Sequence, residues 1–576
     1  MNAPLDALAV HAQQAPDKVA VVVDASGGAT ASRTTFGELN AQVNQLAHGL
    51  LAAGARSGER LVWCGPNSLE VITTIHAARK CNLVAVPLSY RFNGDEMQYV
   101  VDNSDATLVV IDAEQASLLA SVRDRLPKLR AVVVFGGEVP SASGFLAWDD
   151  VCAGRPTREP DVAATSEAGA AMIYTSGTTG KPKGALRTRT NREIVFALLD
   201  ALRLLHESSV HLTTGPLYHS GPLAFASLAH TLGAPVVVLR KFDPVRWIAL
   251  VKEHHVTNSF SAPTQLKRIV SLPTDELAKA DLSSMICLIA NAAPVPYALK
   301  QEIIDKLGDG FLFEVYGSTE LGVDTVLAPE DQLRKPGSCG KPYGGIEIRI
   351  VKDDGTIAGV GEAGELFVRT GLAMDGYHET DEQLTELADN DWKSVGDVAY
   401  VDDEGYVYIC DRIKDMIISG GVNIYPAEIE AVLYAHPQVL DAAVFGIPDD
   451  EWGERVHAVV QAKPGSTLDL AELRAFVDAR VGGYKRPRDY EVRDELPRTE
   501  SGKLLKRVLR DEFWSGRETA VWDDGYPFLL RGRIQCLLLE YDLGISTQIR
   551  EMHTRFDSDL GKVVVEVVGN RAHRDV

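Results

Sequence analysis

The sequence of 576 residues is too long for a single hydrophobic core, so we expect two or more domains. Its 45% apolar and 24% charged residues are ordinary for globular proteins, and its net charge of −22 argues against nucleic acid as the main partner. The N-terminus lacks the basic start and apolar core of a signal peptide, and no apolar run is long enough to cross a bilayer. The seven cysteines form no CxxC pair, which favours free thiols and a cytoplasmic location.

The N-terminal part of the chain alternates predicted strands with predicted helices. The helix over 35–54 has a capping box from Thr35 to Glu38 and an apolar face. A second helix is predicted over 68–81. Strands are predicted over 19–23, 60–65, 83–88, 107–112, 235–240, 285–294 and 311–320. This alternation is typical of parallel sheets covered by helices.

After Gly337 the pattern changes to alternating apolar and polar residues, which predicts antiparallel strands over 346–351, 364–370 and 406–411. A domain boundary is expected near 410–430. We therefore predict an α/β fold, with a large N-terminal domain of parallel sheets and helices plus a small antiparallel barrel, followed by a small α+β C-terminal domain on a hinge. The predicted boundaries are 1–411 for the large domain, 412–515 for the small domain and 516–576 for an extension of unknown role.

A glycine-rich loop follows the short apolar run over 171–174. Its sequence, YTSGTTGKPKG, brings small residues, hydroxyls and lysines together, which suits a polyphosphate. A Walker A loop is excluded, because the position five before Gly180 is Thr175 and Pro182 follows Lys181. The candidate phosphate-binding residues are Thr175, Ser176, Gly177, Thr178, Thr179, Gly180 and Lys183.

This loop resembles the signature loop of the adenylate-forming superfamily, which includes acyl-CoA synthetases, firefly luciferase and nonribosomal-peptide adenylation domains. Other segments resemble the family's remaining motifs in the family's order, over about Pro16 to Trp514: NAAPVP, VYGSTELG, WKSVGDVAY, DRIKDMIISGGVNIYPAEIE and PRTESGKLLKR. Several ordered motifs are far more specific than any single one.

The resemblance implies which residues hold the nucleotide. Adenine would lie along the segment that begins at Asn291 and beside the ring of Tyr316. Asp397 would hold the ribose hydroxyls, and Arg412 would reach the ribose or a phosphate from the hinge side. The implied residues are Asn291, Ala292, Ala293, Tyr316, Gly317, Ser318, Thr319, Asp397 and Arg412. The chain departs from the usual pattern at Asn291, where glycine is more common, and at Val395, where a threonine hydroxyl is either missing or supplied by Ser394.

The implied reaction has two halves. A carboxylate attacks the α-phosphate of ATP to give acyl-AMP and pyrophosphate, and the thiol of CoA then displaces AMP. Glu320 would hold Mg²⁺, Lys503 would offset repulsion between carboxylate and phosphate, and His219 would lie beside the acyl and thiol tunnels. Several of the implied residues also have a purely structural interpretation. Glu320 could cap a helix, Asp397 could be a turn residue, and Lys503 could be a solvated charge.

The small domain would rotate about Lys414 between the two halves. CoA contacts are expected from two segments. The first is the glycine-containing loop of Ser419, Gly420 and Gly421, and the second is the basic turn that contains Lys485 and Arg486. No family motif lies in the extension, although a strand-like KVVVEVV occurs there.

Three functions stay open at this point. The first is an AMP-forming ligase that joins a carboxylic acid to CoA with ATP and Mg²⁺. A fatty acid is the expected substrate, because small residues occur where the acyl pocket is predicted. The second is an enzyme that loads a separate carrier protein, and the third is a binding protein on an inactive ligase scaffold. No nucleic acid or transmembrane segment is expected, and homodimerisation is left open.

Overall fold

The structure is a computed structural model that describes residues 6–28, 30–141, 143–162, 169–175, 182–381, 383–387, 391–420, 422–449, 451–498, 504–514, 553–557 and 562–566. By its contacts the chain divides into two units, 1–513 and 514–576. Among the described residues, no helix combines the length and apolar character that a bilayer crossing requires.

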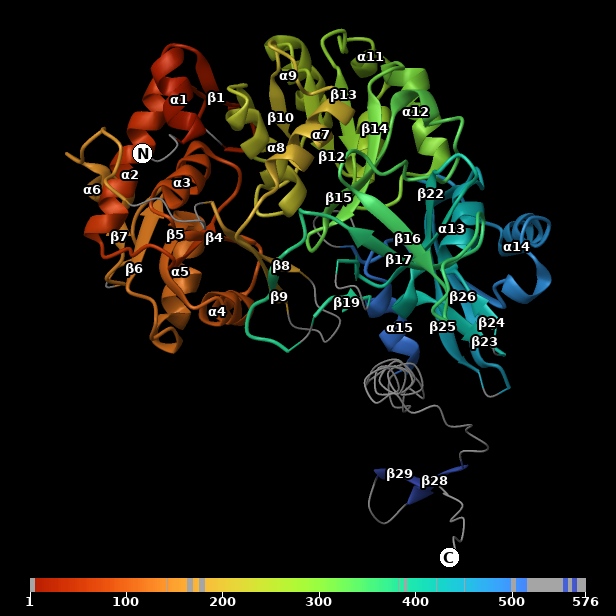
Figure 1. Cartoon of the computed structure of the whole chain (residues 1–576). Helices are drawn as coiled ribbons and strands as arrows, with labels where there is room; N and C mark the ends of the chain where they lie inside the picture. The colour runs from red at the N-terminus through yellow and green to blue at the C-terminus, as the bar shows by residue number, and fades with distance from the viewer. Residues whose placement is uncertain are drawn as a thin grey trace, which may run out of the picture. The chain divides into compact units, whose positions relative to one another are not determined.

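The first sheet is mostly parallel and is covered by helices on both faces (Figure 1). Neighbouring residues of one strand point to opposite cores: Leu61 and Trp63 pack with α2 and α3, whereas Val62 and Cys64 pack with α4 and α5. In sheet order the strands are β18 (Gly376–Tyr377), β9 (Lys183–Arg187), β8 (Ala171–Thr175), β4 (Val84–Leu88), β3 (Arg60–Cys64), β5 (Ala106–Asp112), β6 (Ala131–Phe135) and β7 (Leu146–Ala147).

Its helices are α2 (Phe36–Ala52), α3 (Leu69–Lys80), α4 (Gly94–Asn103), α5 (Ala113–Val122) and α6 (Trp148–Cys152), with a 3₁₀ turn η2 (Arg123–Arg125). The predicted capping box is confirmed, because Thr35 Oγ1 accepts the N–H of Glu38 while the Glu38 carboxylate accepts the N–H of Thr35.

The second sheet has a parallel centre and antiparallel edges. In sheet order its strands are β15 (Gly322–Leu327), β14 (Leu312–Ser318), β13 (Cys287–Ala290), β12 (Asn258–Ser261), β10 (His211–Thr213), β11 (Val236–Val238), β1 (Val19–Val23) and β2 (Ser32–Thr35). Its helical elements are α1 (Ala7–Gln14), η1 (Ser26–Gly28), α7 (Arg192–Ala201), α8 (Ser220–Thr231), α9 (Pro244–His254), α10 (Pro263–Val270), α11 (Thr274–Leu277) and α12 (Tyr297–Leu307).

A third, antiparallel sheet contains the strands predicted after Gly337. It consists of β16 (Glu347–Val351), β17 (Gly364–Arg369), β19 (Thr385–Glu386), β20 (Lys393–Ser394), β21 (Asp397–Val401) and β22 (Val407–Arg412), with η3 (Pro329–Asp331) before it. The hairpin β21–β22 matters most for the site, because its register places Asp397 opposite Arg412 at the end away from the turn.

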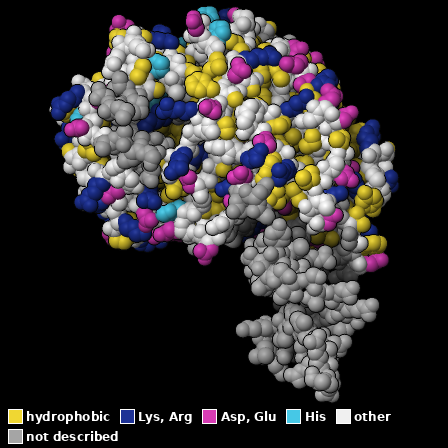
Figure 2. Space-filling view, in the orientation of Figure 1, with side chains coloured by type: hydrophobic (Ala, Val, Ile, Leu, Met, Phe, Trp, Pro, Cys, Tyr) yellow, Lys and Arg dark blue, Asp and Glu magenta, His cyan; other side chains and the backbone are white. Residues whose placement is uncertain are grey.

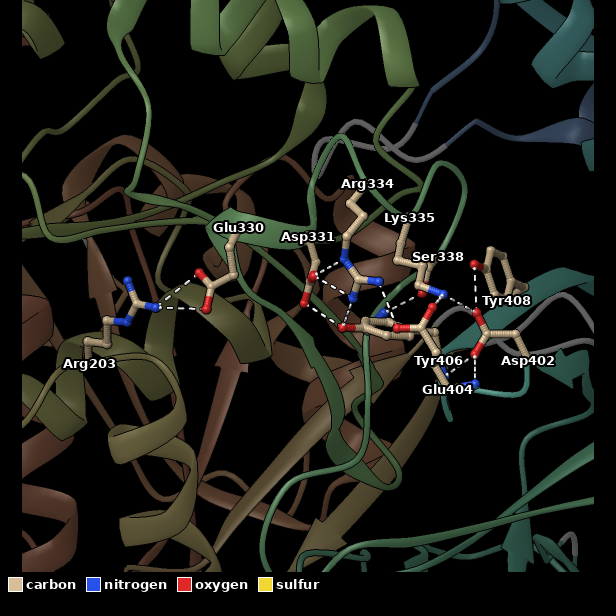
Figure 3. A network of polar contacts seen from close by, with 11 residues as sticks. Arg203, Glu330, Asp331, Arg334, Lys335, Ser338, Asp402, Glu404, Tyr406 and Tyr408 are labelled. Atoms are coloured by element: carbon tan, nitrogen blue, oxygen red, sulfur yellow. Dashed lines mark hydrogen bonds and ion pairs between the residues drawn. The ribbon is translucent and has the colours of Figure 1, made fainter.

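A polar network fixes the turn of this hairpin (Figure 3). Lys335 Nζ lies 2.8 Å from Asp402 and 2.5 Å from Glu404, and Arg334 bonds both Asp331 and Glu404. Burial raises the pKa of Asp402, but hydrogen bonds from Lys335 and from two backbone N–H groups outweigh burial and lower it to about 2. The network therefore anchors one end of β21–β22 and leaves the other end for Asp397 and Arg412.

The remaining residues of the first unit form a smaller α+β assembly around its own core, which includes Ile429, Leu433, Val444 and Val459. Its strands are β23 (Ile417–Ser419), β24 (Val422–Ile424), β25 (Val439–Asp449), β26 (Gly453–Ala462) and β27 (Asp489–Val492). Its helical elements are η4 (Ile413–Asp415), α13 (Pro426–Tyr434), α14 (Leu470–Asp478), η5 (Gly483–Lys485) and α15 (Lys506–Trp514). The predicted boundary at 411/412 stays a proposal.

In the second unit, β28 (His553–Asp557) pairs antiparallel with β29 (Lys562–Glu566), so the strand expected in KVVVEVV is confirmed. The helix-like stretch around Leu538 lies outside the described residues. Throughout the first unit the predicted strands and helices are present, with ends that differ by a few residues.

The centre of the second sheet carries a buried histidine that we expect to link stability to pH. Burial lowers the pKa of His211 to about 4, and its Nδ1 lies 2.7 Å from Asn258 Oδ1. Because an unfolded histidine titrates near 6.5, the unfolded chain gains a proton before the native chain as pH falls, so stability is lost between about 6.5 and about 4.

We predict that His211→Gln removes about 2 kcal/mol of the stability loss between pH 7 and pH 5. Urea unfolding of parent and variant at pH 7, 6 and 5 measures it. As pH falls, the free energy of unfolding should decrease less in the variant than in the parent. A difference between parent and variant that does not vary with pH would contradict the prediction.

Candidate active site

The strands that flank the glycine-rich loop form a hairpin, with Thr175 opposite Lys183. Residues 176–181 lie outside the described residues, so phosphate binding by Ser176, Gly177, Thr178, Thr179 and Gly180 stays a prediction. At the start of β9, Lys183 Nζ lies 5.6 Å from the centre of the Tyr377 ring. Strand β18, which carries Tyr377, pairs with β9 and so brings this ring to the loop.

Glu320 occupies the turn between β14 and β15. Its Oε1 accepts a 2.9 Å hydrogen bond from Tyr377 Oη, and its backbone oxygen accepts the N–H of Met374. Ser318 ends a strand, so the alternative in which Glu320 caps a helix near Ser318 is wrong. The tyrosine fixes one carboxylate oxygen at the edge of the sheet, beside the glycine-rich hairpin.

Thr319 ties this turn to two other elements. Its backbone oxygen accepts a 2.9 Å bond from Arg187 Nη2 on β9, and its hydroxyl lies 3.1 Å from the hydroxyl of Ser220, the first residue of α8. The predicted phosphate and metal residues are thereby connected to the segment that contains His219.

Three of the residues predicted to hold adenosine lie together on three strands. Tyr316 Oη donates to Asp397 Oδ2 at 2.5 Å, and Arg412 Nε lies 3.2 Å from Asp397 Oδ1. Asp397 is buried and is the first residue of strand β21, so the alternative in which it is a turn residue is wrong. Burial together with the charge of Asp397 raises the pKa of Tyr316 well above its usual value. A buried carboxylate between a phenol and a guanidinium suits an acceptor for ribose hydroxyls.

The two departures from the usual motifs have structural explanations. The Asn291 amide donates to the backbone oxygen of Val315 at 2.5 Å, which joins the segment predicted to hold adenine to the strand of Tyr316. The next residue, Ala292, adopts φ +76. Such a φ is uncommon for a residue with a Cβ, and strain of this kind occurs at binding sites. Ser394 is buried and accepts the N–H of Gly396, so its hydroxyl supports the turn before Asp397.

His219 precedes α8, with its ring 4.6 Å from that of Tyr218. Burial, and then the charge of Arg91, lowers its pKa to about 4, so the imidazole is neutral at pH 7. Its Nε2 is buried without a hydrogen-bond partner in the part of the chain that the structure describes. This leaves a neutral ring nitrogen available beside Ser220 and the Thr319 turn.

The predicted hinge and CoA residues lie on the smaller assembly. Lys414 lies in the 3₁₀ turn η4, and just before it Asp411 accepts the N–H of Ala427 at the start of α13. Ser419 ends β23, and Gly420 has φ +58. A Cβ on Gly420 would lie 2.5 Å from the Trp452 ring, so glycine permits this close approach.

The two basic CoA candidates have protein partners. Lys485 Nζ lies 2.6 Å from Glu428, and Arg486 donates to the backbone oxygens of Val481 and Asp478 near the end of α14. Gly421 and the catalytic candidate Lys503 lie outside the described residues. Arg486 thus stabilises a helix end in this structure.

Comparison with known proteins agrees with this arrangement. The family model for the AMP-binding enzyme matches residues 8–378, and that for the AMP-binding enzyme C-terminal domain matches residues 428–503. The chain belongs to the AMP-binding enzyme family. Within it, the chain is an AMP-forming acyl-CoA synthetase that uses ATP, Mg²⁺ and CoA.

Individual relatives extend over most of the chain. A feruloyl-CoA synthase of an Amycolatopsis species is 36% identical, with 83% of this chain and 94% of that protein covered. A fatty acid–acyl-carrier-protein ligase, ScoC of Streptomyces coeruleorubidus, is 32% identical, with 88% and 95% covered. The structure of o-succinylbenzoate CoA synthetase from Bacillus subtilis with its acyl-adenylate has a TM-score of 0.75 at 28% identity, with 88% and 98% covered.

Sequence reasoning missed three residues that shape the site: Tyr377, which bonds Glu320, Ser220, which reaches Thr319, and Trp452, which packs on Gly420. Tyr377 and Trp452 lie outside the recognised motifs. Ser220 directly follows His219, and this adjacency to a predicted site residue was the only feature of the sequence that could have indicated it.

We predict that Asp397→Asn raises the KM for ATP by about 10- to 100-fold, because it removes the charge from hydrogen bonds that are worth about 1.5–3 kcal/mol. ATP-dependent pyrophosphate exchange at saturating acid measures this. Tyr316→Phe, which keeps the ring and loses only the Asp397 bond, is the matched control and should have a smaller effect. An unchanged KM in a folded Asp397→Asn protein would contradict the assignment.

Proposed function

We propose that the chain activates an apolar carboxylic acid as its acyl-AMP and transfers the acyl group to CoA. The observation that carries the proposal is the convergence of Tyr316, Asp397 and Arg412 with the Glu320–Thr319 turn and the β8–β9 hairpin. This brings an adenosine site and a phosphate site next to the segment of His219, where the acid must enter.

Charge neutralisation is the main task of the first half-reaction, since a carboxylate must approach a polyphosphate. The chain is strongly acidic, and Figure 2 shows basic and acidic side chains interspersed over the face that it draws. Individual cations must therefore neutralise the negative charge of the two reactants. We assign this role to Lys183 at the loop, Arg412 on the ribose side and Lys503.

The surroundings of Glu320 fit Mg²⁺, because this ion takes few protein carboxylates and completes its shell with water and phosphate oxygens. Tyr377 orients the Glu320 carboxylate, and the Thr319 hydroxyl lies at the same turn. When bound there with ATP, Mg²⁺ would offset phosphate charge. Glu320 would hold the ion and Thr319 would contact phosphate.

The acid is expected to be apolar and of medium or greater length, with a fatty acid as the first candidate. Phe225 and Phe260 stack with centroids 5.5 Å apart, and Gly221 packs so closely that a Cβ there would lie 2.4 Å from the Phe260 ring. The two rings supply apolar contact, and the absence of a side chain at Gly221 lets α8 pack directly against the Phe260 ring of β12. ScoC is named for a fatty acid and the Amycolatopsis enzyme for a ring acid, so both classes belong in a substrate screen.

The surroundings of Gly420 suit the CoA that this enzyme uses. Trp452 is 40% exposed beside Gly420, and the Arg488 guanidinium lies 5.3 Å from its ring centre. An exposed indole next to a cation suits a nucleotide with phosphates. ScoC is named for an acyl-carrier protein, so AMP release with a carrier protein in place of CoA tests whether a carrier is a second acceptor. Cytoplasmic location stays part of the proposal, in keeping with the free thiols of Cys64, Cys81, Cys152, Cys287, Cys339 and Cys410.

We further propose that the smaller assembly turns about Lys414 between the half-reactions, so that the loop at Ser419 and Gly420 replaces Lys503 at the site. The position of Lys414 in a short 3₁₀ turn after Arg412 supports this, because few backbone angles need to change. Homodimerisation and the role of residues 516–576 stay open.

Acid length should matter. We predict that octanoate and longer apolar acids exceed acetate in kcat/KM, because each buried CH₂ contributes about 0.8 kcal/mol. CoA-dependent AMP formation across acids of graded length and ring content measures this. A preference for acetate or for an amino acid would contradict the apolar assignment.

Lys503→Ala should separate the two half-reactions. We predict a fall of about two to three orders of magnitude in acyl-AMP formation, as for loss of one preorganised electrostatic group. Thioester formation from synthetic acyl-AMP and CoA should stay near the parent rate. The matched control is Lys506→Ala on α15, whose amine pairs with Glu430 at 2.8 Å and should show no such split. An equal fall in both half-reactions, with the fold intact, would contradict the role of Lys503.

A further inference from the structure

A buried ion pair joins helix α12 to strand β14 beside the candidate nucleotide site. Lys300 Nζ lies 2.5 Å from Glu314 Oε2, and the two side chains are only 1% and 10% exposed. Neither atom has a hydrogen-bond partner among the residues that the structure describes, so each charge depends on the other. Both residues lie outside the motifs that indicated the nucleotide site.

Such a pair is a poor source of stability. Moving two charges from water into the interior costs several kcal/mol per ion, and apolar residues of similar size often stabilise a fold as well or better. The pair is therefore better explained by what it holds in place than by the stability that it adds.

The pair holds the end of the segment 291–296, which is predicted to carry adenine. Glu314 pairs with Ala290, the last residue of β13, so the segment leaves the sheet beside Glu314. At the end of the segment, the N–H of Val295 donates to Glu314 Oε1 at 3.3 Å. Lys300, on the helix that follows, contacts the other oxygen of the same carboxylate. Glu314 thus attaches both the segment and α12 to β14.

The start of the segment is attached to the same strand. Asn291 donates to the backbone oxygen of Val315, the neighbour of Tyr316. Between the two attachments, Ala292 and Ala293 are partly exposed. The spacing between the middle of the segment and the strand that carries Tyr316 is therefore set at both ends. A preorganised frame of this kind favours a ligand that matches its spacing and its polar groups.

We propose that Glu314 and Lys300 are positioning residues that set the selectivity of the nucleotide site for adenine. They hold the segment 291–296 where its backbone bonds the edge of the base while the base lies beside Tyr316. A loosened segment would lose these bonds and with them the preference for adenine. This inference rests on the proposed adenosine site. The ligand class is a purine nucleoside triphosphate, distinguished by the group at position 6 of the base.

The test compares ATP with inosine triphosphate (ITP), in which an oxygen replaces the 6-amino group of adenine. Acid-dependent pyrophosphate exchange by the full chain gives kcat/KM for each nucleotide. The parent should favour ATP by about 30-fold or more. In Glu314→Gln/Lys300→Met, which keeps similar side-chain sizes and leaves no buried charge, this ratio should fall about 10-fold. The kcat at saturating ATP should stay within about twofold, because no reacting group is touched.

Two further variants separate positioning from folding. Lys267→Met/Glu302→Gln is the matched control, since it removes the 2.7 Å ion pair that joins α10 to the same helix α12, and it should leave the ratio unchanged. Glu314→Asp keeps the charge on a shorter side chain and should lower the ratio less than the double variant does. Thermal unfolding checks each fold, and Glu314→Asp decides if the double variant does not fold.

An unchanged ratio in the folded double variant would overturn the inference. So would an equal fall in kcat/KM for ATP and ITP, because a purely structural pair gives that result, and so would a parent that uses the two nucleotides equally. The proposed function stands in all three cases. If no acid supports exchange with either nucleotide, the proposed function fails and the inference fails with it.

Discussion

The buried carboxylate of Asp397 holds together the parts on which this site depends. It accepts the Tyr316 hydroxyl from the second sheet and faces Arg412 across the β21–β22 hairpin. Through Tyr316 it touches the strand that leads to Glu320, and through Arg412 it touches the residue that precedes the proposed hinge. A single acid thus joins two sheets and the start of the smaller assembly, which explains why the chain keeps a charge in the interior.

Rigid support surrounds this acid. The network of Arg334, Lys335, Asp402 and Glu404 anchors the turn of the same hairpin, and Tyr377 and Arg187 hold the Glu320–Thr319 turn from β18 and β9. Surface ion pairs contribute little singly, but a connected group fixes a loop more firmly. The result is a preorganised arrangement in which few groups need to move when a polyphosphate binds.

Much of the fold follows from local sequence. The capping box of Thr35 and Glu38, the apolar strands and the proline at the start of α13 are signals within a few residues, and the structure confirms them. The ordered motifs also indicated the family. The exact partners of side chains were not predictable in this way: the basic residue Arg486 bonds helix carbonyls, and Tyr377 reaches Glu320 from 57 positions along the chain. Such contacts depend on how sheets pack, which no local pattern encodes.

In the proposed first half-reaction, the acid's own carboxylate oxygen attacks the α-phosphate of ATP. Incubation of the enzyme with ATP, CoA and an accepted acid labelled with ¹⁸O in its carboxylate tests this directly, because the displaced AMP keeps the oxygen that formed the acyl-phosphate bond. Mass spectrometry should find one ¹⁸O in AMP and none in pyrophosphate. Label in inorganic phosphate with formation of ADP, or thioester formation with unlabelled AMP, would contradict the account.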